Sequence, residues 1–316
     1  MSVEKIRAPR NRTLRVTAGE AEELLKRTLF PDGKILNFPE AENRIICADI
    51  FAVSPLLPRK FADLIIADPP YNLTKNFNGR IFRSGGIAEY EAYTRQWLTA
   101  IAPLLKPEGS IYVCCDWASS PVIGRVLGEF FELRNRITWQ REKGRGAAAN
   151  WKNCSEDIYF ATAGKNYTFN LDAVKIRRKV IAPYRCDGNP KDWVESADGN
   201  YRDSCPGNFW DDITVPFWSM PENTDHPAQK PEKLLAKLIL ASSNENDVVF
   251  DPFGGSGSTA VAAKKLNRRY CSVEIDREFC ALTEKRLQIA GSDRSIQGFD
   301  GKVFYERNSG PLIKKR

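Results

Sequence analysis

The segment of the sequence best suited to chemistry is Asp68-Pro69-Pro70-Tyr71, which directly follows a short apolar run at 62–66. The run predicts a buried parallel strand, and the prolines end it because neither can donate a hydrogen bond to a sheet. A carboxylate, a rigid turn and an aromatic ring are therefore expected at the carboxyl end of a strand. Open α/β sheets bind their ligands at this edge.

These residue types suit the activation of a planar exocyclic amine, whose lone pair is delocalised into its base. Acceptors placed against the two amine hydrogens favour pyramidalisation of the nitrogen and stabilise its developing positive charge. We expect the Asp68 carboxylate and the Pro69 carbonyl to be these acceptors, and the Tyr71 ring to be a surface for stacking the base. The alternative is an ordinary Pro-Pro turn at the end of a strand.

A second group of candidate residues follows a predicted strand at 248–251. The turn into the predicted helix 259–266 is rich in glycine and serine, so backbone amides and a helix N terminus could approach a ligand. The next strand, 271–274, ends in Glu274, roughly 20 residues further on, where a carboxylate takes ribose hydroxyls. This order of strand, glycine-rich loop, helix, strand and acid predicts an adenosine-containing cofactor. Residues 255–260 also fit the GxGxxA pattern of NAD-binding proteins, whereas the missing Walker lysine argues against ATP hydrolysis.

Composition limits the classes of protein that need to be considered. The 316 residues are 42% hydrophobic and 28% charged, which suits one large α/β domain with an insertion, or two domains. The net charge of +7 permits a polyanionic partner without requiring one. No apolar run approaches the length of a membrane span, and no signal peptide leads the chain.

The cysteines and the single histidine argue against a metal centre. Eight cysteines lack CxxC spacing, and His226 is the only histidine, so we expect no zinc site and no other metal. The thiols are expected to be reduced and mostly buried, which indicates a cytosolic protein.

The remaining elements are predicted from periodicity and turn residues. Further helices are expected at 20–29, 89–105, 121–131 and 230–241, and further strands at 44–49, 110–115, 136–140 and 157–161. Asp49, at the end of the first of these strands, suits either a helix N-cap or the ligand crevice. The polar stretch 72–86 is either a lid over the site or a plain surface loop.

Basic and aromatic side chains accumulate across 134–185, a pattern found in nucleic-acid-binding surfaces and also on ordinary solvated faces. Residues 166–221 show weak periodicity and predict an irregular inserted module. The arginine-rich residues 1–20 predict a solvated arm, or one that contacts phosphates. The candidate DNA-binding residues are Lys75, Arg141, Lys143, Arg145, Trp151 and Lys152.

Taken together, residues 44 to 290 resemble the amino-methylating DNA methyltransferases that use S-adenosylmethionine. Asp68-Pro69-Pro70-Tyr71 is similar to their catalytic motif, 251–259 to their cofactor loop, and His226-Pro227-Ala228-Gln229-Lys230-Pro231 to the segment before that loop. The catalytic motif precedes the cofactor loop, as in the circularly permuted group called beta. Ala228 and Ser258 depart from the family by replacing a hydroxyl residue and a threonine.

The resemblance implies a fold and roles for single residues. The fold is a doubly wound, mostly parallel seven-stranded sheet, Rossmann-like, with an inserted irregular target-recognition region. Asp68, Pro69, Pro70 and Tyr71 would hold a flipped-out base. His226 and Lys230 would lie near the methionine end of the cofactor, Asp49 near its adenine, and Glu274 on its ribose. The cofactor cleft would further comprise Asp251, Pro252, Phe253, Gly254, Gly255, Ser256, Gly257, Ser258 and Thr259.

The resemblance also implies a domain division and partners. We expect an N-terminal basic arm and short helix at 1–43, a discontinuous catalytic domain at 44–165 and 222–292, the target-recognition region at 166–221 and a C-terminal tail at 293–316. The partner would be DNA, and the protein would be cytoplasmic and nucleoid-associated in a bacterium or phage. Members of the group are often homodimers, and a cognate restriction endonuclease stays an open question.

Aspartate before Pro-Pro-Tyr favours adenine N6 as the methyl acceptor over cytosine N4. Methylation of cytosine C5 needs a thiol after proline, and the chain has Cys205-Pro206 but no Pro-Cys. The rival hypotheses are an N4-cytosine, RNA or protein-amide methyltransferase, a non-catalytic nucleic-acid-binding module with a vestigial cofactor fold, and a nicotinamide-dependent dehydrogenase. The last would leave the Asp68–Tyr71 motif unexplained.

Overall fold

The computed structural model describes residues 8–141, 148–181, 184–195 and 199–307. The α-helices are α1 (Ala18–Leu25), α2 (Phe38–Ala41), α3 (Ile50–Val53), α4 (Ile87–Ile101), α5 (Ser120–Phe130), α6 (Glu232–Ser242), α7 (Ser258–Lys265) and α8 (Arg277–Ser292). Short 3-10 helices are η1 (Ser54–Leu56), η2 (Ala102–Leu104) and η3 (Leu171–Val174).

The strands fall into a central sheet and several smaller ones. The central sheet contains β1 (Arg44–Cys47), β2 (Ala62–Ala67), β5 (Leu105–Cys115), β6 (Glu132–Gln140), β7 (Ser155–Thr162), β12 (Phe209–Trp210), β13 (Val248–Asp251) and β14 (Arg269–Glu274). The others are β3 (Lys75–Phe77), β4 (Arg80–Phe82), β8 (Ile176–Lys179), β9 (Arg185–Cys186), β10 (Asn189–Pro190), β11 (Tyr201–Ser204), β15 (Phe299–Asp300) and β16 (Val303–Tyr305).

The central sheet is mostly parallel and runs in the order β1-β14-β13-β2-β5-β7-β6-β12. The first five strands in this order, β1, β14, β13, β2 and β5, pair in parallel, whereas β7 is antiparallel to both of its neighbours. The prediction of a doubly wound α/β sheet is confirmed. Seven strands were expected, and the eighth is the two-residue strand β12, which is too short to show a periodicity of its own.

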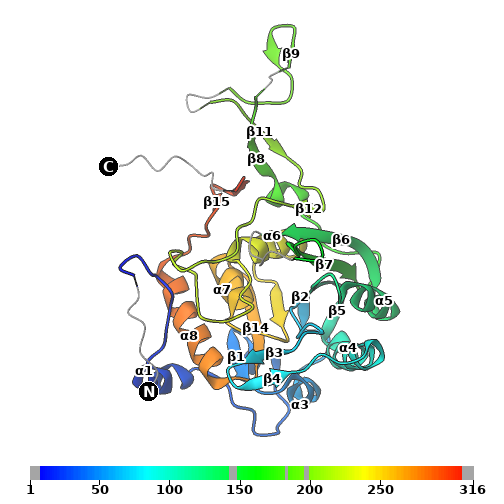
Figure 1. The fold of residues 1–316 in the computed structure, drawn as a ribbon, viewed down its shortest axis with the longest axis vertical. Coiled ribbons are helices and arrows are strands. Elements are labelled where there is room, and N and C mark those ends of the chain that lie inside the picture. The colour runs from blue at the N-terminus through cyan, green and yellow to red at the C-terminus, as the bar shows by residue number, and fades with distance from the viewer. Residues whose placement is uncertain (1–7, 142–147, 182–183, 196–198, 308–316) are drawn as a thin grey trace.

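Helices cover both faces of this sheet, and the strand sequences explain why (Figure 1). Successive residues of a strand point to opposite faces. In β2, Ile65 packs in the cluster with α4 and α5, whereas Leu64 and Ile66 pack in the cluster with α6 and α7. Both faces of the strand are therefore apolar, as expected of a strand buried between two layers.

Several predicted boundaries differ from the observed ones. The first helix ends at Leu25 rather than at residue 29, because Leu29 pairs its backbone with Cys47 of β1 instead. The helix predicted at 89–105 ends at Ile101, where Pro103 introduces η2. The stretch 72–86 is not irregular throughout, since it forms the β3–β4 hairpin around Asn78-Gly79.

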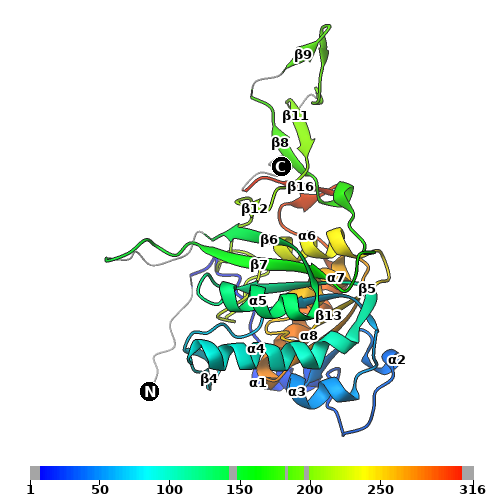
Figure 2. The same cartoon turned by 90° about the vertical axis from the view of Figure 1, so that its right-hand side faces the viewer.

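The inserted region projects from the body as a narrow arm (Figures 1 and 2). Its strands β8 and β11 pair antiparallel, and β16 pairs in parallel with β8. Residues 299–305, expected to be part of a C-terminal tail, therefore share a sheet with the insertion. Phe304 is fully buried there and packs with Val174 and Ile176.

Two further findings concern the cysteines and membranes. All eight cysteines are free, but Cys154, Cys186 and Cys205 are exposed, so burial holds for only part of the set. Within the described part of the chain, no helix has the length and apolar character needed to cross a membrane.

Candidate functional site

Three neighbouring strands bring the predicted acids to one edge of the sheet. Strand β2 lies beside β13, and β13 lies beside β14, all in parallel. Their carboxyl ends carry Asp68, Asp251 and Glu274 respectively. All three side chains line one cavity of about 500 Å³, together with Pro69, Pro70 and Tyr71. The two predicted groups of residues, which are far apart in the sequence, thus meet in a single site.

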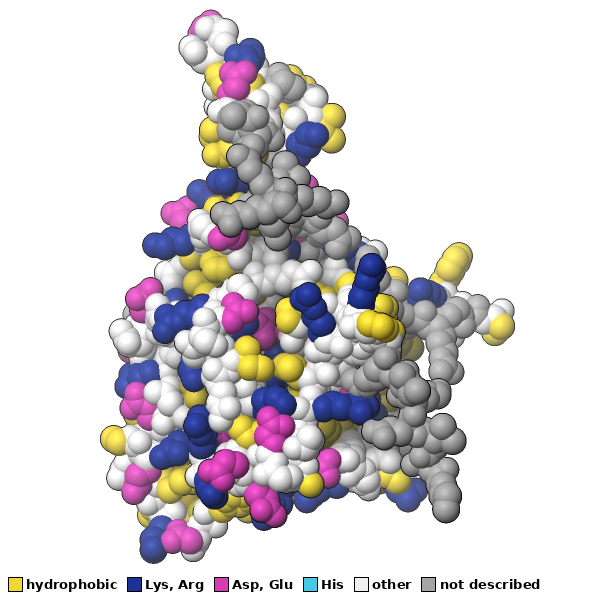
Figure 3. Space-filling model, turned by 90° about the vertical axis from the view of Figure 1, so that its left-hand side faces the viewer, with side chains coloured by type: hydrophobic (Ala, Val, Ile, Leu, Met, Phe, Trp, Pro, Cys, Tyr) yellow, Lys and Arg dark blue, Asp and Glu magenta, His cyan; other side chains and the backbone are white. Residues whose placement is uncertain are grey.

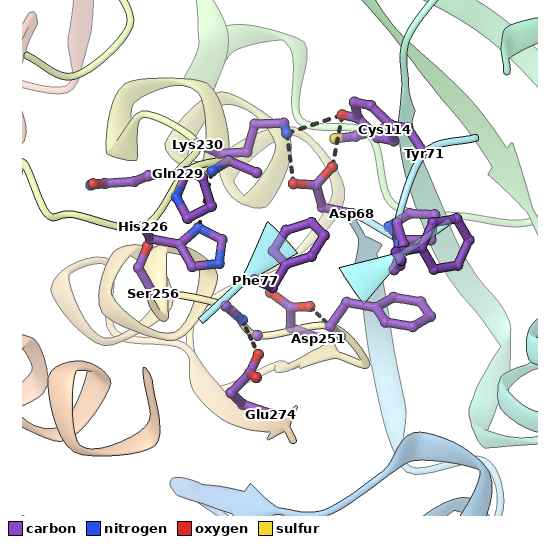
Figure 4. A pocket seen from close by; sticks show the side chains of 18 of the residues that line it. Asp68, Tyr71, Phe77, Cys114, His226, Gln229, Lys230, Asp251, Ser256 and Glu274 are labelled. Carbon is purple, nitrogen blue, oxygen red and sulfur yellow. Dashed lines mark hydrogen bonds and ion pairs between the residues drawn. The ribbon is translucent and has the colours of Figure 1, made fainter. Parts of the chain in front are cut away.

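One side of the cavity contains Asp68 and Tyr71 and is called the base side, after the role expected of these residues. Here Asp68 is held by two donors (Figure 4). The Tyr71 hydroxyl donates to Asp68 Oδ1 at 2.8 Å, and Lys230 Nζ donates to Oδ2 at 2.6 Å. Lys230 Nζ also lies 3.1 Å from the Tyr71 hydroxyl oxygen. The ammonium of Lys230 therefore binds the Asp68–Tyr71 pair, and its expected place near the methionine end of the cofactor stays a prediction.

Glu156 of β7 belongs to the same cluster and was not predicted. Its Oε2 lies 3.3 Å from the Tyr71 hydroxyl and 3.4 Å from Lys230 Nζ, and its Oε1 forms an ion pair with Arg141. The Glu156 side chain is 6% exposed. Alternation along β7 could have identified it, since Glu156 is in phase with the buried residues Ile158 and Phe160, and a buried acid needs a partner.

Burial and these carboxylates shift the pKa values of the cluster. Burial alone would lower the pKa of Lys230, but the charges of Asp68 and Glu156 raise it above its ordinary value. Burial, followed by the charge of Asp68, raises the pKa of Tyr71 well above its usual range. Lys230 is consequently a permanent cation near neutral pH, and Tyr71 a neutral hydrogen-bond donor.

The other side contains Asp251, Glu274 and the loop after β13 and is called the cofactor side. Here two carboxylates accept hydrogen bonds from backbone amides. Glu274 Oε2 accepts from Gly255 N at 2.6 Å and Oε1 from Asp276 N at 2.8 Å. Asp251 Oδ1 accepts from Phe253 N at 2.9 Å. Burial raises the pKa of both Glu274 and Asp251 to about 7. These acids are desolvated but retain acceptor capacity toward the cavity.

The loop between β13 and α7 needs glycine at two positions with positive φ. Gly255 has φ +52°, and an added Cβ would lie 3.0 Å from the His226 ring. Gly257 has φ +76°, and an added Cβ would lie 2.1 Å from Thr283. A Cβ at either position is strained, so the loop can pack this closely only with glycine. The loop residues in the cavity wall are Asp251, Pro252, Phe253, Gly254, Gly255, Ser256, Ser258 and Thr259.

His226 and Asp49 both line the cavity, as predicted. His226 Nδ1 accepts from Ala228 N at 3.3 Å, and its ring meets the Phe279 ring edge-on at 4.5 Å between centroids. Burial lowers the pKa of His226 to about 4, so the ring is neutral near pH 7. Asp49 accepts from Phe51 N at 2.9 Å, which confirms it as the N-cap of α3, while its place near a cofactor adenine stays a prediction.

The β3–β4 hairpin contributes cavity residues that were not predicted, among them Phe77 and Phe82. Asn78 at its tip donates to Asp276 and Glu278 at the start of α8, which joins the hairpin to the cofactor side. Lys75 Nζ donates to the Pro227 carbonyl at 3.3 Å. Its side chain thus lines the cavity rather than an outer surface.

Three of the other proposed DNA contacts, Arg141, Trp151 and Lys152, are among the described residues. Arg141 lines the cavity and pairs with Glu156. Trp151 is 96% exposed, and Lys152 is exposed beside it. Lys143 and Arg145 lie outside the described residues. Within the described ranges, no group of three His, Cys, Asp or Glu residues could hold a metal ion.

Comparison with known proteins gives consistent matches. A family model described as a DNA methylase of the N6/N4 class matches residues 62–285. The DNA adenine methyltransferase YhdJ of Escherichia coli (strain K12) is 34% identical, over 80% of this chain and 85% of its own. The type II methyltransferase M.HpaI of Haemophilus parainfluenzae is 32% identical, over 87% of this chain and 83% of its own.

Solved structures show the same fold. The M1.HpyAVI–SAM complex matches with a TM-score of 0.53 and 24% identity, over 77% of this chain and 98% of its own. The cytosine-N4-specific PvuII DNA methyltransferase matches with a TM-score of 0.58 and 17% identity, over 79% of this chain and 92% of its own. Given the extent of the family match and the identity to these relatives, the chain belongs to the N6/N4 family of DNA methylases.

Proposed function

We propose that this protein transfers a methyl group from S-adenosylmethionine to N6 of an adenine in DNA, at a base turned out of the duplex. The observation that carries the proposal is the single cavity that joins Asp68 and Tyr71 to the loop 251–259 and Glu274. A base amine and a methyl donor can meet only if both sites open into one space. The adenine-specific relative YhdJ supports the choice of base.

The base side supplies acceptors for an amine. Asp68 is an ionic acceptor at the end of a rigid strand, and Pro69 and Pro70 fix the backbone that follows it. An acceptor of this kind favours a pyramidal nitrogen and the positive charge that develops there. Lys230 and Tyr71 hold the carboxylate in place, which limits the rearrangement needed at the moment of reaction.

The cofactor side fits S-adenosylmethionine by the chemistry of its donors and acceptors. Glu274 offers lone pairs to ribose hydroxyls, and Asp251 offers a carboxylate toward a cationic ligand. Neutral His226 and Phe279 give an apolar wall that adds no competing positive charge. When bound, the cofactor supplies an electrophilic methyl group on a sulfonium. The role of these residues is to hold it and to exclude water.

The target must leave the base stack to reach this cavity, because an amine inside a duplex cannot approach a buried donor. Residues 148–154 lead into β7 and project away from the body of the molecule, and the β8–β11 arm projects in another direction (Figure 2). Asn153 lies in the cavity wall. We assign recognition of the DNA sequence to the β8–β11 arm and to Trp151. On the face that carries α8, lysines and arginines alternate with acids, which does not favour DNA there (Figure 3).

The direct test is incubation with labelled S-adenosylmethionine and DNA of mixed sequence, followed by digestion and separation of the nucleosides. We expect labelled N6-methyladenine in the wild-type product. Labelled N4-methylcytosine would show that cytosine, not adenine, is the substrate. Transfer to neither base would overturn the proposal. Tyr71→Ala removes the surface on which the base stacks, so it is expected to reduce transfer while leaving cofactor binding intact.

A further inference from the structure

A single phenolic proton faces two carboxylates on the base side of the cavity. The Tyr71 hydroxyl lies 2.8 Å from Asp68 Oδ1 and 3.3 Å from Glu156 Oε2. A phenol carries one proton and can donate one good hydrogen bond at a time. The shorter distance assigns that proton to Asp68 and leaves Glu156 as a second acceptor within reach.

An amine that binds Asp68 must compete with the donors already there. Lys230 occupies Oδ2 at 2.6 Å with a full positive charge, so its bond is the stronger of the two. The Tyr71 hydroxyl on Oδ1 is neutral and is therefore the donor more easily displaced. Displacement leaves a buried hydroxyl, which destabilises the complex unless another acceptor takes its proton.

The contacts and position of Glu156 suit it to be that acceptor. Its Oε1 is held by Arg141, which leaves Oε2 directed at Tyr71 and Lys230. Glu156 pairs with Trp139 of β6, and β7 is paired with both β5 and β6 from the next residue, Asp157, onward, so the carboxylate sits on a rigid support. No movement of the backbone is needed for Tyr71 to change partner.

We propose that Glu156 is a positioning residue that takes over the Tyr71 hydroxyl when the amine of the target base takes over Asp68. The inference rests on the proposed function and adds a step to it. In the free protein the hydroxyl holds Asp68 in place. In the complex Glu156 keeps the same hydroxyl satisfied, and the Tyr71 ring stays where the base can stack on it.

A double-mutant cycle of Tyr71→Phe and Glu156→Gln tests this exchange. The readouts are kcat and KM on a duplex with one target site, and fluorescence of 2-aminopurine at the target position to follow base extrusion. We expect Glu156→Gln to lower kcat roughly tenfold or more in the wild-type background, with extrusion retained. In the Tyr71→Phe background, which has no hydroxyl to place, the same change should alter kcat by less than about threefold.

Equal losses in the two backgrounds would overturn the proposal, because Glu156 would then act only through Arg141 and Lys230. Glu132→Gln, which removes an exposed carboxylate of β6, is the control for loss of charge on this sheet. Binding of S-adenosylhomocysteine by calorimetry reports folding of each variant. If Glu156→Gln does not fold, the cycle with Glu156→Asp decides instead, since it keeps the charge but withdraws the oxygen from Tyr71.

The failure of the proposed function has a different signature. A wild-type protein that transfers no methyl group to adenine would refute that function before any variant is compared. A wild type that methylates adenine, combined with a cycle that shows no coupling, would refute only the role of Glu156.

Discussion

The two sides of the cavity treat their buried carboxylates in opposite ways. On the base side, Asp68 and Glu156 both lie within 4.0 Å of Lys230, and Glu156 also pairs with Arg141. On the cofactor side, Asp251 and Glu274 accept backbone amides, and neither has an ion pair with any residue that the structure describes.

This difference separates two ways of binding a ligand. The base side is electrostatically complete in the free protein, so a base has to exchange hydrogen bonds with groups already in place. The cofactor side is incomplete, which is why burial raises the pKa of Asp251 and Glu274, and a ligand with hydroxyls and a positive charge completes it. Changes on the base side should therefore affect folding and rate, and changes on the cofactor side should affect affinity and its pH dependence.

The largest effect is expected from Lys230→Met. It leaves Asp68 and Glu156 without their shared buried cation, which should lower the free energy of unfolding by about 3–5 kcal/mol. Urea denaturation of the ligand-free protein measures this. The control is Lys285→Met, whose partner Glu20 is partly exposed, with an expected loss of roughly 0–1 kcal/mol. Similar losses for the two variants would mean that the base side is not held together by its charges.

The next largest effect is expected from Asp68→Asn, which should lower the rate of methyl transfer. An amide accepts less strongly than a carboxylate and does not stabilise the charge on the attacking nitrogen, so kcat should fall by about 10²–10³. The affinity for S-adenosylhomocysteine should stay within about threefold, because it depends on the other side of the cavity. Parallel losses of rate and affinity would show that the two sides are one coupled unit.

A smaller effect is expected from pH on the cofactor side. With pKa values of about 7, Asp251 and Glu274 are protonated at lower pH, and a proton on Glu274 competes with a ribose hydroxyl for its oxygens. The affinity for S-adenosylhomocysteine should thus rise with pH and level off above about pH 8, by roughly tenfold in all. Glu274→Gln should weaken binding at pH 8 and make the pH dependence shallower. Calorimetry at three pH values tests both points.

The stability of the ligand-free protein should change with pH in the opposite direction, falling as pH rises. Both acids have a folded pKa above their ordinary values of 3.8 and 4.5, so the folded state binds the protons more tightly. Their contribution to the free energy of unfolding is complete below about pH 4 and is lost as pH rises toward about pH 7. Saturating cofactor should remove part of this loss, since bound hydroxyls replace the missing partners.

Residues at strand ends were predictable from local sequence, whereas contacts between side chains of different strands were not. Asp68 and Glu274 each follow an apolar run, and the topology of parallel sheets brings such ends together. Alternation along β7 can mark Glu156 as a buried acid, but its partners Tyr71, Lys230 and Arg141 come from other parts of the chain, so no single segment encodes these contacts. The pairing of β16 with β8 joins residues about 130 positions apart, so the C-terminal segment looked like a tail.

The β3–β4 hairpin was predictable but was not predicted. Asn78 and Gly79 have φ values of 51° and 91°, the backbone of a two-residue hairpin turn that favours Asn-Gly. The two flanking strands have only three residues each, so alternation was too short to recognise and the stretch suggested only a lid or a loop. The hairpin position over the cofactor side is fixed by Asn78 and α8, a contact between distant parts of the chain.

The smallest expected effect is that of His226→Gln, and it decides which groups make binding depend on pH. Burial lowers the pKa of His226 to about 4, so the only histidine of the chain stays neutral from pH 6 to 8. Glutamine keeps an acceptor for Ala228 N but loses the ring that packs on Phe279. The affinity for S-adenosylhomocysteine should fall by about two- to fivefold at every pH, as expected for lost aromatic contact. If His226→Gln instead abolished the pH dependence, the imidazole would be the titrating group, and Asp251 and Glu274 would not control the affinity for the cofactor.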